Sequence, residues 1–247
     1  MTSGLGTGPL AEKYPLGPTV NITGLTNSNK CSKQLFEMRA KPETEQRLLE
    51  AAGEVFAAHG FRAATVREIC QRAGANVAAV NYHFGDKEGL YFAVLKSGSE
   101  AALKKYPPTL DLGPTATAAE RLHAFVRSLL LRIVDKGQPS WHGKLIAHEM
   151  AEPTKALTAL IDDVYGPVLR QLETIVRELL GRRPPPAVLR QCLLSILGQC
   201  LYFHYARPAI QHIHPDQGFE PVDIECLAKH ITQFSLAGIR QAAAAGR

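Results

Sequence analysis

The stretch that decides the fold is GANVAAVNYHFGDKEGL, Gly74–Leu90. Gly74 supplies a left-handed turn at low steric cost, and Asn76 is a favourable N-cap for a short helix over 77–83. Gly85 is expected to end that helix. The front of the helix carries only small side chains, whereas its rear carries an aromatic–histidine–aromatic cluster. A helix meant only for a core would carry leucines throughout, so the pattern predicts that something large approaches the front end.

Helical patterns flank this stretch on both sides. A helix over 44–59 is expected to end at Gly60, and T-V-R-E at Thr65–Glu68 predicts a capping box that begins a second helix. A fourth helix is expected from about Asp86 to Lys105. The inner faces of these helices should carry Leu48, Ala52, Val55, Phe56, then Val66, Ile69, Cys70, Ala73, then Leu90, Tyr91, Val94, Leu95.

Two short helices joined by a glycine-containing turn, with a third helix in front, predict a helix-turn-helix. The second helix of such a motif enters the DNA major groove by its N-terminal end. Small side chains at Val77, Ala78 and Ala79 would let it sit deep between the phosphates. Asn76 and Asn81 offer amides of the kind that pair with adenine. These residues are candidates for reading base sequence.

Further DNA contacts are expected at the two ends of the motif. Tyr82, His83 and Lys87 lie where donors meet phosphate oxygens, and Thr65 begins a helix whose N-terminal N–H groups favour a phosphate. Phe84 is expected to pack in the core. Three short helices also occur in folds that do not bind DNA, and His83 could be a half-buried polar residue.

Composition places few limits on function. The chain has 247 residues, 45% of them hydrophobic, and a net charge of +5. Lys41–Lys105 holds nine Lys/Arg against eight Asp/Glu, so a DNA-binding role must rest on the placement of particular groups. Five cysteines without a C-x-x-C pair argue against a zinc cluster and a disulfide framework. We expect no signal peptide, no bilayer-spanning run, no cofactor and a cytoplasmic location.

The remainder of the chain also reads as helical, and no strand alternation of useful length occurs. We therefore predict an all-α fold with an N-terminal three-helix helix-turn-helix domain and a larger helical ligand-binding and dimerisation domain. Residues 1–40 read as a disordered tail, with Met38 as an alternative start. The predicted domains are 41–106, with the helix-turn-helix at about 65–84, and 115–243. Further helices are expected over 117–136, 140–151, 154–180 with a kink or split at Pro167, 187–206 and 222–243.

The run Glu45–Leu95 resembles the DNA-binding domain of the TetR family of repressors. It carries the lead A-x-x-x-F-x-x-x-G-[FY]-x-x-x-[ST], an A-G turn and the tail Y-H-F-x-x-K-E-x-L in order. N-V-A-A-V-N-Y-H-F resembles the CecR-like branch more narrowly, as do HEMAEPTKAL and LGQCLYFHYARPAI in the second half. Many TetR relatives have Tyr-Tyr or Tyr-Trp where this chain has Asn81-Tyr82, so Asn81 either reads a base or loses a phosphate contact.

The resemblance implies a homodimeric repressor that binds a palindromic double-stranded DNA operator and is released by a small-molecule effector, not an enzyme. The residues themselves also favour dimerisation. The helix over 187–206 is apolar nearly all round, which is more than one core can use. A four-helix contact across a two-fold axis would combine Leu189, Leu193, Ile196, Leu197, Leu201, Phe203 with Ile224, Leu227, Ile231, Phe234.

A ligand pocket is expected among the central helices of the second domain. The polar cluster in WHGKLIAHEMAEP includes His142 and Glu152. The predicted lining is Phe125, Trp141, His148, Glu149, Tyr165 and Tyr202.

Two alternatives to an effector-controlled regulator stay open. His148 and Glu152 share a helix face and could hold a metal, but H-E-x-x-E lacks the second histidine of zinc hydrolases, so no metal site is predicted. His212 and His214 sit in an expected loop. The alternatives are a DNA-binding regulator without an effector and a helical metal-binding protein or enzyme.

Overall fold

The computed structural model describes residues 28–134, 141–181 and 183–245, and all elements within those ranges are helical. Contacts along the chain divide it after Pro42 into two units, Met1–Pro42 and Glu43–Arg247. Every helix after α1 belongs to the second unit. The predicted all-α class is confirmed, with a helix-turn-helix followed by a helical C-terminal domain.

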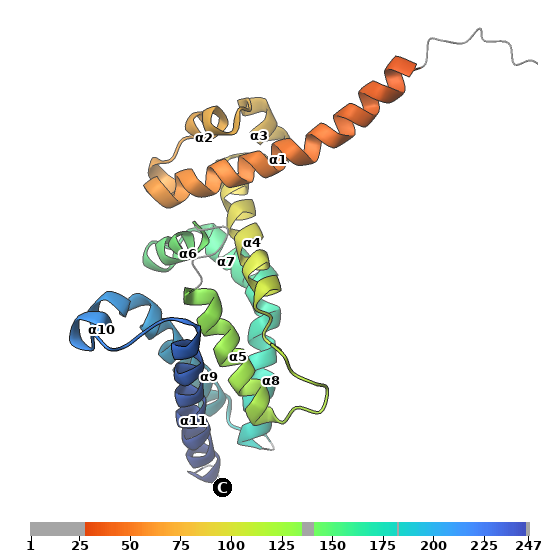
Figure 1. The fold of residues 1–247 in the computed structure, drawn as a ribbon. Helices are drawn as coiled ribbons and strands as arrows, with labels where there is room; N and C mark the ends of the chain where they lie inside the picture. The colour runs from red at the N-terminus through yellow and green to blue at the C-terminus, as the bar shows by residue number, and fades with distance from the viewer. Residues whose placement is uncertain (1–27, 135–140, 182, 246–247) are drawn as a thin grey trace, which may run out of the picture. The chain divides into compact units, whose positions relative to one another are not determined.

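Figure 1 shows the helices in chain order. The N-terminal ones are α1 (Ser28–Ala63), α2 (Val66–Ala73), α3 (Val77–Phe84) and α4 (Lys87–Lys105). The later ones are α5 (Ala118–Val134), α6 (His142–Ala151), α7 (Lys155–Leu160), the π-helical turn η1 (Ile161–Tyr165), α8 (Gly166–Leu180), α9 (Pro186–Tyr205), α10 (Arg207–Ile213) and α11 (Pro221–Ala245).

Local signals placed the helix-turn-helix correctly. Gly60 leaves helical geometry inside α1 at φ 73°, and Gly74 is left-handed at φ 60° after α2. Asn76 caps α3, because its Oδ1 accepts the Ala79 N–H at 2.9 Å. Asp86 caps α4 in the same way through the Gly89 N–H, at 2.8 Å. Short-range hydrogen bonds therefore fix where each of these helices begins.

The capping box of α2 forms only in part. Thr65 Oγ1 accepts the Glu68 N–H at 3.2 Å. The Glu68 carboxylate, however, lies 3.4 Å from His59 Nε2 and 4.0 Å from an Arg72 nitrogen instead of returning to Thr65. A full box occurs at Thr117 and Glu120 before α5, where sequence reading did not place one.

The prediction that the disordered tail extends to residue 40 was wrong. Residues 1–27 lie outside the described residues, but 28–40 belong to α1 rather than to an irregular segment. That stretch contains Lys, Gln, Leu, Glu, Met, Arg and Ala, which lose little side-chain freedom in a helix, so its propensity favours one despite its place near the terminus.

Two other predicted elements differ in detail. The expected helix over 154–180 is divided, with the π-helical turn η1 just before Pro167, which fits the predicted kink or split. His212 belongs to α10 rather than to a loop, because Pro208 lies in its first turn, where its missing N–H costs nothing. His214 is the C-cap of that helix.

The buried apolar side chains form two clusters. The first joins the predicted inner faces of α1, α2 and α4 with Val80 of α3, and it continues into α6, α7 and η1 through Trp141, Leu145, Leu160 and Val164. The second gathers α5, α8, α9 and α11, which pack against one another. The domain boundaries at 106 and 115 stay predictions, because side chains beyond residue 115 share the first cluster.

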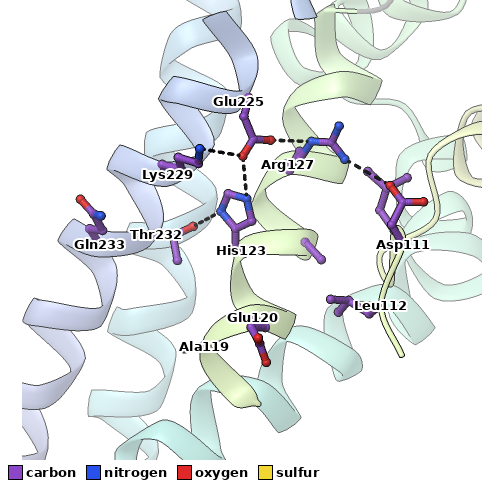
Figure 2. Close-up of a pocket in the computed structure, with 12 residues that line it drawn as sticks. Asp111, Leu112, Ala119, Glu120, His123, Arg127, Glu225, Lys229, Thr232 and Gln233 are labelled. Atoms are coloured by element: carbon purple, nitrogen blue, oxygen red, sulfur yellow. Dashed lines mark hydrogen bonds and ion pairs between the residues drawn. The ribbon is translucent and has the colours of Figure 1, made fainter. Parts of the chain in front are cut away.

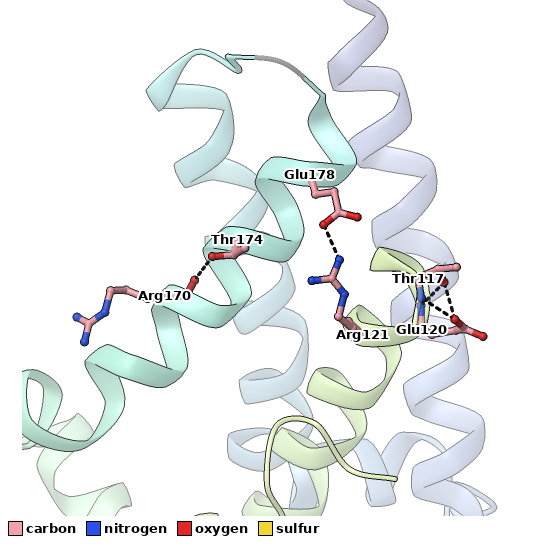
Figure 3. A network of polar contacts seen from close by, with 6 residues as sticks. All are labelled: Thr117, Glu120, Arg121, Arg170, Thr174 and Glu178. Atoms are coloured by element: carbon pink, nitrogen blue, oxygen red, sulfur yellow. Dashed lines mark hydrogen bonds and ion pairs between the residues drawn. The ribbon is translucent and has the colours of Figure 1, made fainter. Parts of the chain in front are cut away.

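Polar contacts hold the outer ends of α5 and α8 together (Figure 3). Arg121 forms an ion pair with Glu178, and Thr117 caps α5 together with Glu120 one turn away. Thr174 Oγ1 donates to the Arg170 carbonyl oxygen at 2.9 Å within α8. These groups are largely solvent-accessible, so their contribution to stability is small beside that of the apolar cluster.

The expectation of no bilayer-spanning run needs correction for α9. This 20-residue helix contains an 18-residue window with mean hydropathy 1.2, so it is long and apolar enough to cross a membrane by length and composition alone. Leu189, Ile196 and Cys200 of this helix are nevertheless buried in the second cluster. Only 17% of that window is buried in the described structure, and one such helix is by itself weak evidence for a membrane.

Candidate nucleic-acid interface and ligand cavity

The front of α3 is uncovered in the described structure. Asn76, Val77 and Ala78 are exposed, with Val77 at 49%, while Val80 turns inward and is fully buried. Ala79 is half-buried and packs against the first cluster. The helix thus presents small side chains on the outside while one valine anchors it. This geometry allows close approach to a groove.

The two asparagines are placed differently. The side-chain oxygen of Asn76, Oδ1, accepts the capping hydrogen bond, so only the Nδ2 group of the side chain remains to contact DNA while the cap is intact. Asn81 is exposed one turn further on, and its side chain makes no hydrogen bond to the described residues. A bidentate pair with adenine needs both ends of an amide, so this geometry favours Asn81 over Asn76 as a base reader.

The predicted phosphate contacts also differ in availability. Tyr82 is 68% exposed and lies edge-on to the His83 ring. His83 is half-buried, with Nδ1 3.8 Å from a Glu45 oxygen. Lys87 Nζ donates to the Arg62 carbonyl oxygen at 3.2 Å and lies 4.7 Å from the centre of the Phe61 ring.

The two other residues singled out in the motif, Thr65 and Phe84, also differ in exposure. Thr65 is exposed, although its hydroxyl accepts the Glu68 N–H. Phe84 is half-buried and packs against the first cluster, as expected. Because Lys87 contacts Arg62 and Phe61, it joins α4 to the end of α1, and its ammonium group is only partly available to bind a phosphate.

A cavity of about 270 Å³ lies among α4, α5, α6, α7, η1, α8 and α9. Of the predicted lining residues, Phe125 and Tyr165 border it. Its walls are mainly apolar, and several apolar residues at its edge are exposed: Met150, Ile161 and Leu169. Apolar walls with a few polar groups are typical of small-molecule sites.

The other four predicted lining residues do not border this cavity. Trp141 is buried in the first cluster, and Glu149 is only 1% exposed and bonded within the protein. His148 is exposed on the opposite side of α6, where it borders a different hollow beside α1. Tyr202 is 62% exposed on α9. The sequence placed them on the correct helices, but the rotation of each helix was decided by packing.

Trp141, just before α6, packs against both α1 and α4. A Cβ atom added at Gly53 of α1 would lie 2.6 Å from Trp141 Cζ2, and one added at Gly98 of α4 would lie 3.1 Å from Trp141 Cζ3. The indole therefore rests directly on the backbone of both helices. At Gly53 only glycine leaves room for the indole, whereas at Gly98 the nearest obstacle to a side chain is His142, whose Cδ2 would lie 2.6 Å from an added Cβ.

Glu149 forms a second link between α6 and the N-terminal helices. Its carboxylate accepts the Tyr91 hydroxyl at 2.8 Å, and it accepts the Thr154 N–H and hydroxyl at 3.1 and 3.0 Å. Burial and the neighbouring carboxylate raise the pKa of Tyr91, so its hydroxyl stays protonated and donates. The role of Glu149 in the structure is thus a buried hydrogen-bonded bridge.

The polar groups of the cavity come from α4, α5, α6, η1 and α9, the last of which contributes His204 and Tyr205. The Tyr165 hydroxyl donates to Ser99 Oγ at 3.0 Å, and Ser99 Oγ lies 3.1 Å from His142 Nε2. Burial, with a smaller effect from the Arg132 charge, lowers the pKa of His142 to about 4, so the imidazole is neutral at pH 7. Burial raises the pKa of Tyr165, which also stays neutral.

Arg132 is the charged group of the cavity. Its Nε donates to the Ser128 carbonyl oxygen at 3.3 Å, whereas its Nη2 is buried and has no hydrogen-bond partner among the described residues. Sequence reading missed both Ser99 and Arg132. The signal for Arg132 was present, since it is the lone charge in L-L-L-R-I-V, whereas nothing marked Ser99.

A second hollow of about 490 Å³ lies between α5 and α11 (Figure 2). Apart from Glu120, which accepts hydrogen bonds from Thr117, its charged groups are paired with one another. Glu225 lies 2.8 Å from Arg127, 3.3 Å from His123 and 3.5 Å from Lys229, and Arg127 also lies 3.6 Å from Asp111. The charges of this hollow are thus satisfied internally, in contrast to that of Arg132.

Within the described residues, no group of three or more His, Cys, Asp and Glu side chains is arranged to hold a metal. The i, i+4 pair His148 and Glu152 has no third ligand there. Glu149, which lies between them in the sequence, faces the protein interior.

An exposed helix in a three-helix motif, followed by a second helical domain, is the arrangement found in helix-turn-helix transcriptional regulators. Residues 48–94 match the family model of bacterial regulatory proteins of the TetR family, and residues 118–239 match the model of the C-terminal domain of the transcriptional dual regulator CecR. The chain belongs to the TetR family of transcriptional regulators, in the CecR-like branch.

Similar proteins agree with this assignment. The dual regulator CecR of Shigella flexneri is 26% identical over 182 residues, covering 68% of this chain and 78% of that protein. The repressor AcnR of Corynebacterium glutamicum is 42% identical over 53 residues, or 22% of this chain and 28% of that protein. These relatives are regulators and not enzymes, as predicted for this chain.

Solved structures share the fold. A putative transcriptional regulator from Pseudomonas aeruginosa PAO1 superposes with a TM-score of 0.61 at 20% identity, covering 80% of this chain and 92% of that chain. A transcriptional regulator from Rhodococcus sp. Rha1 gives 0.53 at 20% identity, covering 78% and 96%.

Proposed function

We propose that this chain is a cytoplasmic homodimeric repressor that binds a palindromic operator and is released by a small molecule in the cavity of its C-terminal domain. The observation that supports DNA recognition best is the uncovered front of α3, held in place by Val80 and the Asn76 cap. Two such helices in a dimer would enter successive major grooves, so the half-sites should lie about 34–36 Å or a multiple apart.

Release would pass from the cavity to the DNA-binding helices through α6. His142 borders the cavity, and its neighbour Trp141 rests on α1 and α4 at Gly53 and Gly98. A ligand that favours another position of α6 would therefore change how α1 and α4 are held. A coupling of about 1–3 kcal/mol is enough for a 5- to 150-fold change in DNA affinity.

The test is a fluorescence-anisotropy titration with the DNA upstream of the chain's own gene, repeated at several salt concentrations. Binding that weakens steeply with salt supports DNA recognition, because phosphate contacts release counterions. Binding that no small molecule weakens would favour the alternative of a regulator without an effector. Absence of any salt-sensitive binding would contradict the DNA-binding proposal.

The Asn76 cap and Asn81 amide can be separated by substitution. We expect Asn76→Ala to cost about 0.5–2 kcal/mol of folding stability because it removes the cap, whereas Asn76→Ser retains a capping oxygen. Asn81→Ala should leave stability nearly unchanged but weaken operator binding by about 1–3 kcal/mol, with little effect on random DNA. Thermal unfolding and anisotropy measure the two effects. Equal losses on operator and random DNA would assign Asn81 to a phosphate contact.

The dimer interface is proposed on the outer faces of α9 and α11. Several residues predicted there belong to the protein's own core, namely Leu189, Ile196, Ile224, Leu227 and Ile231. Phe234, which was predicted there, is 65% exposed, and the exposed apolar residues Leu194 and Tyr202, which were not, lie on α9 at 61% and 62%. A hollow between the two helices is lined by Phe234 and by the small residues Ser195 and Gly238, which permit close approach. A two-fold contact would cover this surface.

Phe234→Asp should convert the dimer to monomer. A charge at the centre of an apolar interface is expected to cost at least about 2 kcal/mol of association energy, or some 30-fold in affinity. Sedimentation velocity at several protein concentrations measures the change. Val222→Asp is the control, because Val222 is 69% exposed on α11 yet lies twelve residues away at its start. If both variants remain dimeric, the interface lies elsewhere.

A further inference from the structure

The cavity holds a positive charge that nothing in the described protein neutralises. Arg132 borders it, and none of the ion pairs among the described residues involves this arginine. Its Nη2 is buried without a hydrogen-bond partner. A buried charge is costly unless it is paired, so an anion that paired with this guanidinium would relieve the cost.

The other polar side chains of the cavity are Ser99, His142, Tyr165, His204 and Tyr205, and none of them is a carboxylate. Tyr165, Ser99 and His142 form a chain of contacts of 3.0 and 3.1 Å along one wall. None of them supplies a negative charge to Arg132. The surrounding walls are apolar, with Phe125, Leu129 and Ile133 of α5 and Leu197 and Leu201 of α9 among them. The site therefore combines one cation with a largely apolar enclosure.

We infer that the effector is a small lipophilic monocarboxylate whose carboxylate pairs with Arg132 and whose apolar body fills the cavity. This inference rests on the proposed function and names the class of its ligand. A carboxylate carries the charge opposite to that of the guanidinium and can accept two parallel hydrogen bonds from it. This favours a carboxylate over a neutral hydroxyl or a cationic amine. The volume of about 270 Å³ lies just below the range of drug-sized sites. At the ~30 Å³ that a water molecule occupies in the liquid, it holds roughly ten non-hydrogen atoms.

The neighbouring hollow between α5 and α11 does not share this chemistry. Arg127, on the same helix as Arg132, is already paired with Glu225 and Asp111. A carboxylate ligand would have to displace those partners there. Arg127 is thus already paired with carboxylates, whereas Arg132 is not, which makes Arg127 a matched control.

The experiment measures direct binding to the full-length protein by isothermal titration calorimetry. Octanoate is compared with octan-1-ol and octan-1-amine, which share its chain but are neutral and cationic, and 3-phenylpropanoate distinguishes an aromatic body from an alkyl one. We expect octanoate or 3-phenylpropanoate to bind about 10- to 100-fold more tightly than the alcohol, and the amine not to bind. Equal affinity for acid and alcohol would overturn the inference.

Variants assign the effect to one side chain. Arg132→Gln should reduce the preference for acid over alcohol to within about threefold, Arg132→Lys should retain part of it, and Arg127→Gln should leave it unchanged. Arg132→Met should unfold at the same or a higher temperature than the wild type, because it removes an unpaired buried charge. A clear loss of stability in Arg132→Met would show that the guanidinium has a structural partner and would sink the proposal.

Binding and DNA release are read separately. If octanoate binds through Arg132 but does not weaken operator binding, the ligand class stands and the proposed mechanism of release fails. If neutral or cationic compounds release DNA while no carboxylate binds, release stands and the ligand class fails.

Discussion

Trp141→Ala is expected to lower the free energy of unfolding by about 3–5 kcal/mol. The indole is 8% exposed and packs in the first cluster against Gly53 and Gly98, so its removal leaves a cavity between α6, α1 and α4. The glycine backbones lack side chains that could close the space. Urea denaturation followed by far-ultraviolet circular dichroism measures the loss, because this is the only tryptophan in the chain and the variant has no indole fluorescence.

A matched substitution separates volume from shape. Trp141→Phe retains an aromatic ring and should cost less than half as much as Trp141→Ala. Gly53→Ala examines the same contact from α1, since the new methyl group would collide with the indole. A change of less than 1 kcal/mol for Trp141→Ala would mean that α6 is not held against α1 in the way described.

Trp141 substitutions should also alter communication between the domains. Under the proposed function, Trp141→Ala weakens the connection from α6 to α1, so an effector that still binds would release less DNA. The anisotropy titration with and without ligand measures this. An unchanged ratio of the two affinities in a folded variant would place the connection elsewhere.

Glu149→Ala is the second substitution with a large expected effect. It leaves the buried Tyr91 hydroxyl and the Thr154 N–H without their acceptor, at a cost of about 1–3 kcal/mol for each buried group left unsatisfied. Thermal and urea unfolding measure the loss. Glu149→Gln retains an acceptor of the same size and should be milder, which separates the hydrogen bonds from the packing.

A double-mutant cycle isolates the bond between α4 and α6. Tyr91→Phe removes only the hydroxyl that donates to Glu149, so its effect should shrink when Glu149 is already replaced by Ala, which has no acceptor. Additive effects of the two substitutions would indicate that the 2.8 Å contact contributes little to stability. Glu152→Ala, one turn from His148 and exposed, serves as the control of the same helix region.

The helix-turn-helix was predictable because its signals are local. Thr65, Asn76 and Asp86 cap helices through bonds to residues three positions along the chain, and Gly74 adopts its left-handed turn from its own lack of a side chain. The apolar periodicity of α1 and α4 predicted a face that is fully buried. The predicted capping box was wrong at Glu68, because its carboxylate pairs with His59 and Arg72 rather than returning to Thr65.

The ligand cavity could not be predicted at the level of single residues. Ser99, Arg132, His142 and Tyr165 come from α4, α5, α6 and η1, and nothing within any one helix shows that the other three will face it. Glu149 looked like a pocket group because buried and lining carboxylates have the same sequence signature. A helix rotated by one position exchanges its inward and outward residues, and that rotation depends on packing against distant partners.

The amino-acid sequence by itself determined the helix-turn-helix and its caps, the small-residue front of α3 and the family, because each depends on neighbours within a few residues or on a contiguous motif. Tertiary structure alone decided that Trp141 rests on two glycines, that Glu149 is a buried bridge and that Arg132 enters an apolar cavity without a partner. The burial and pairing of a polar group depend on side chains far away in the chain, which only the assembled fold brings together.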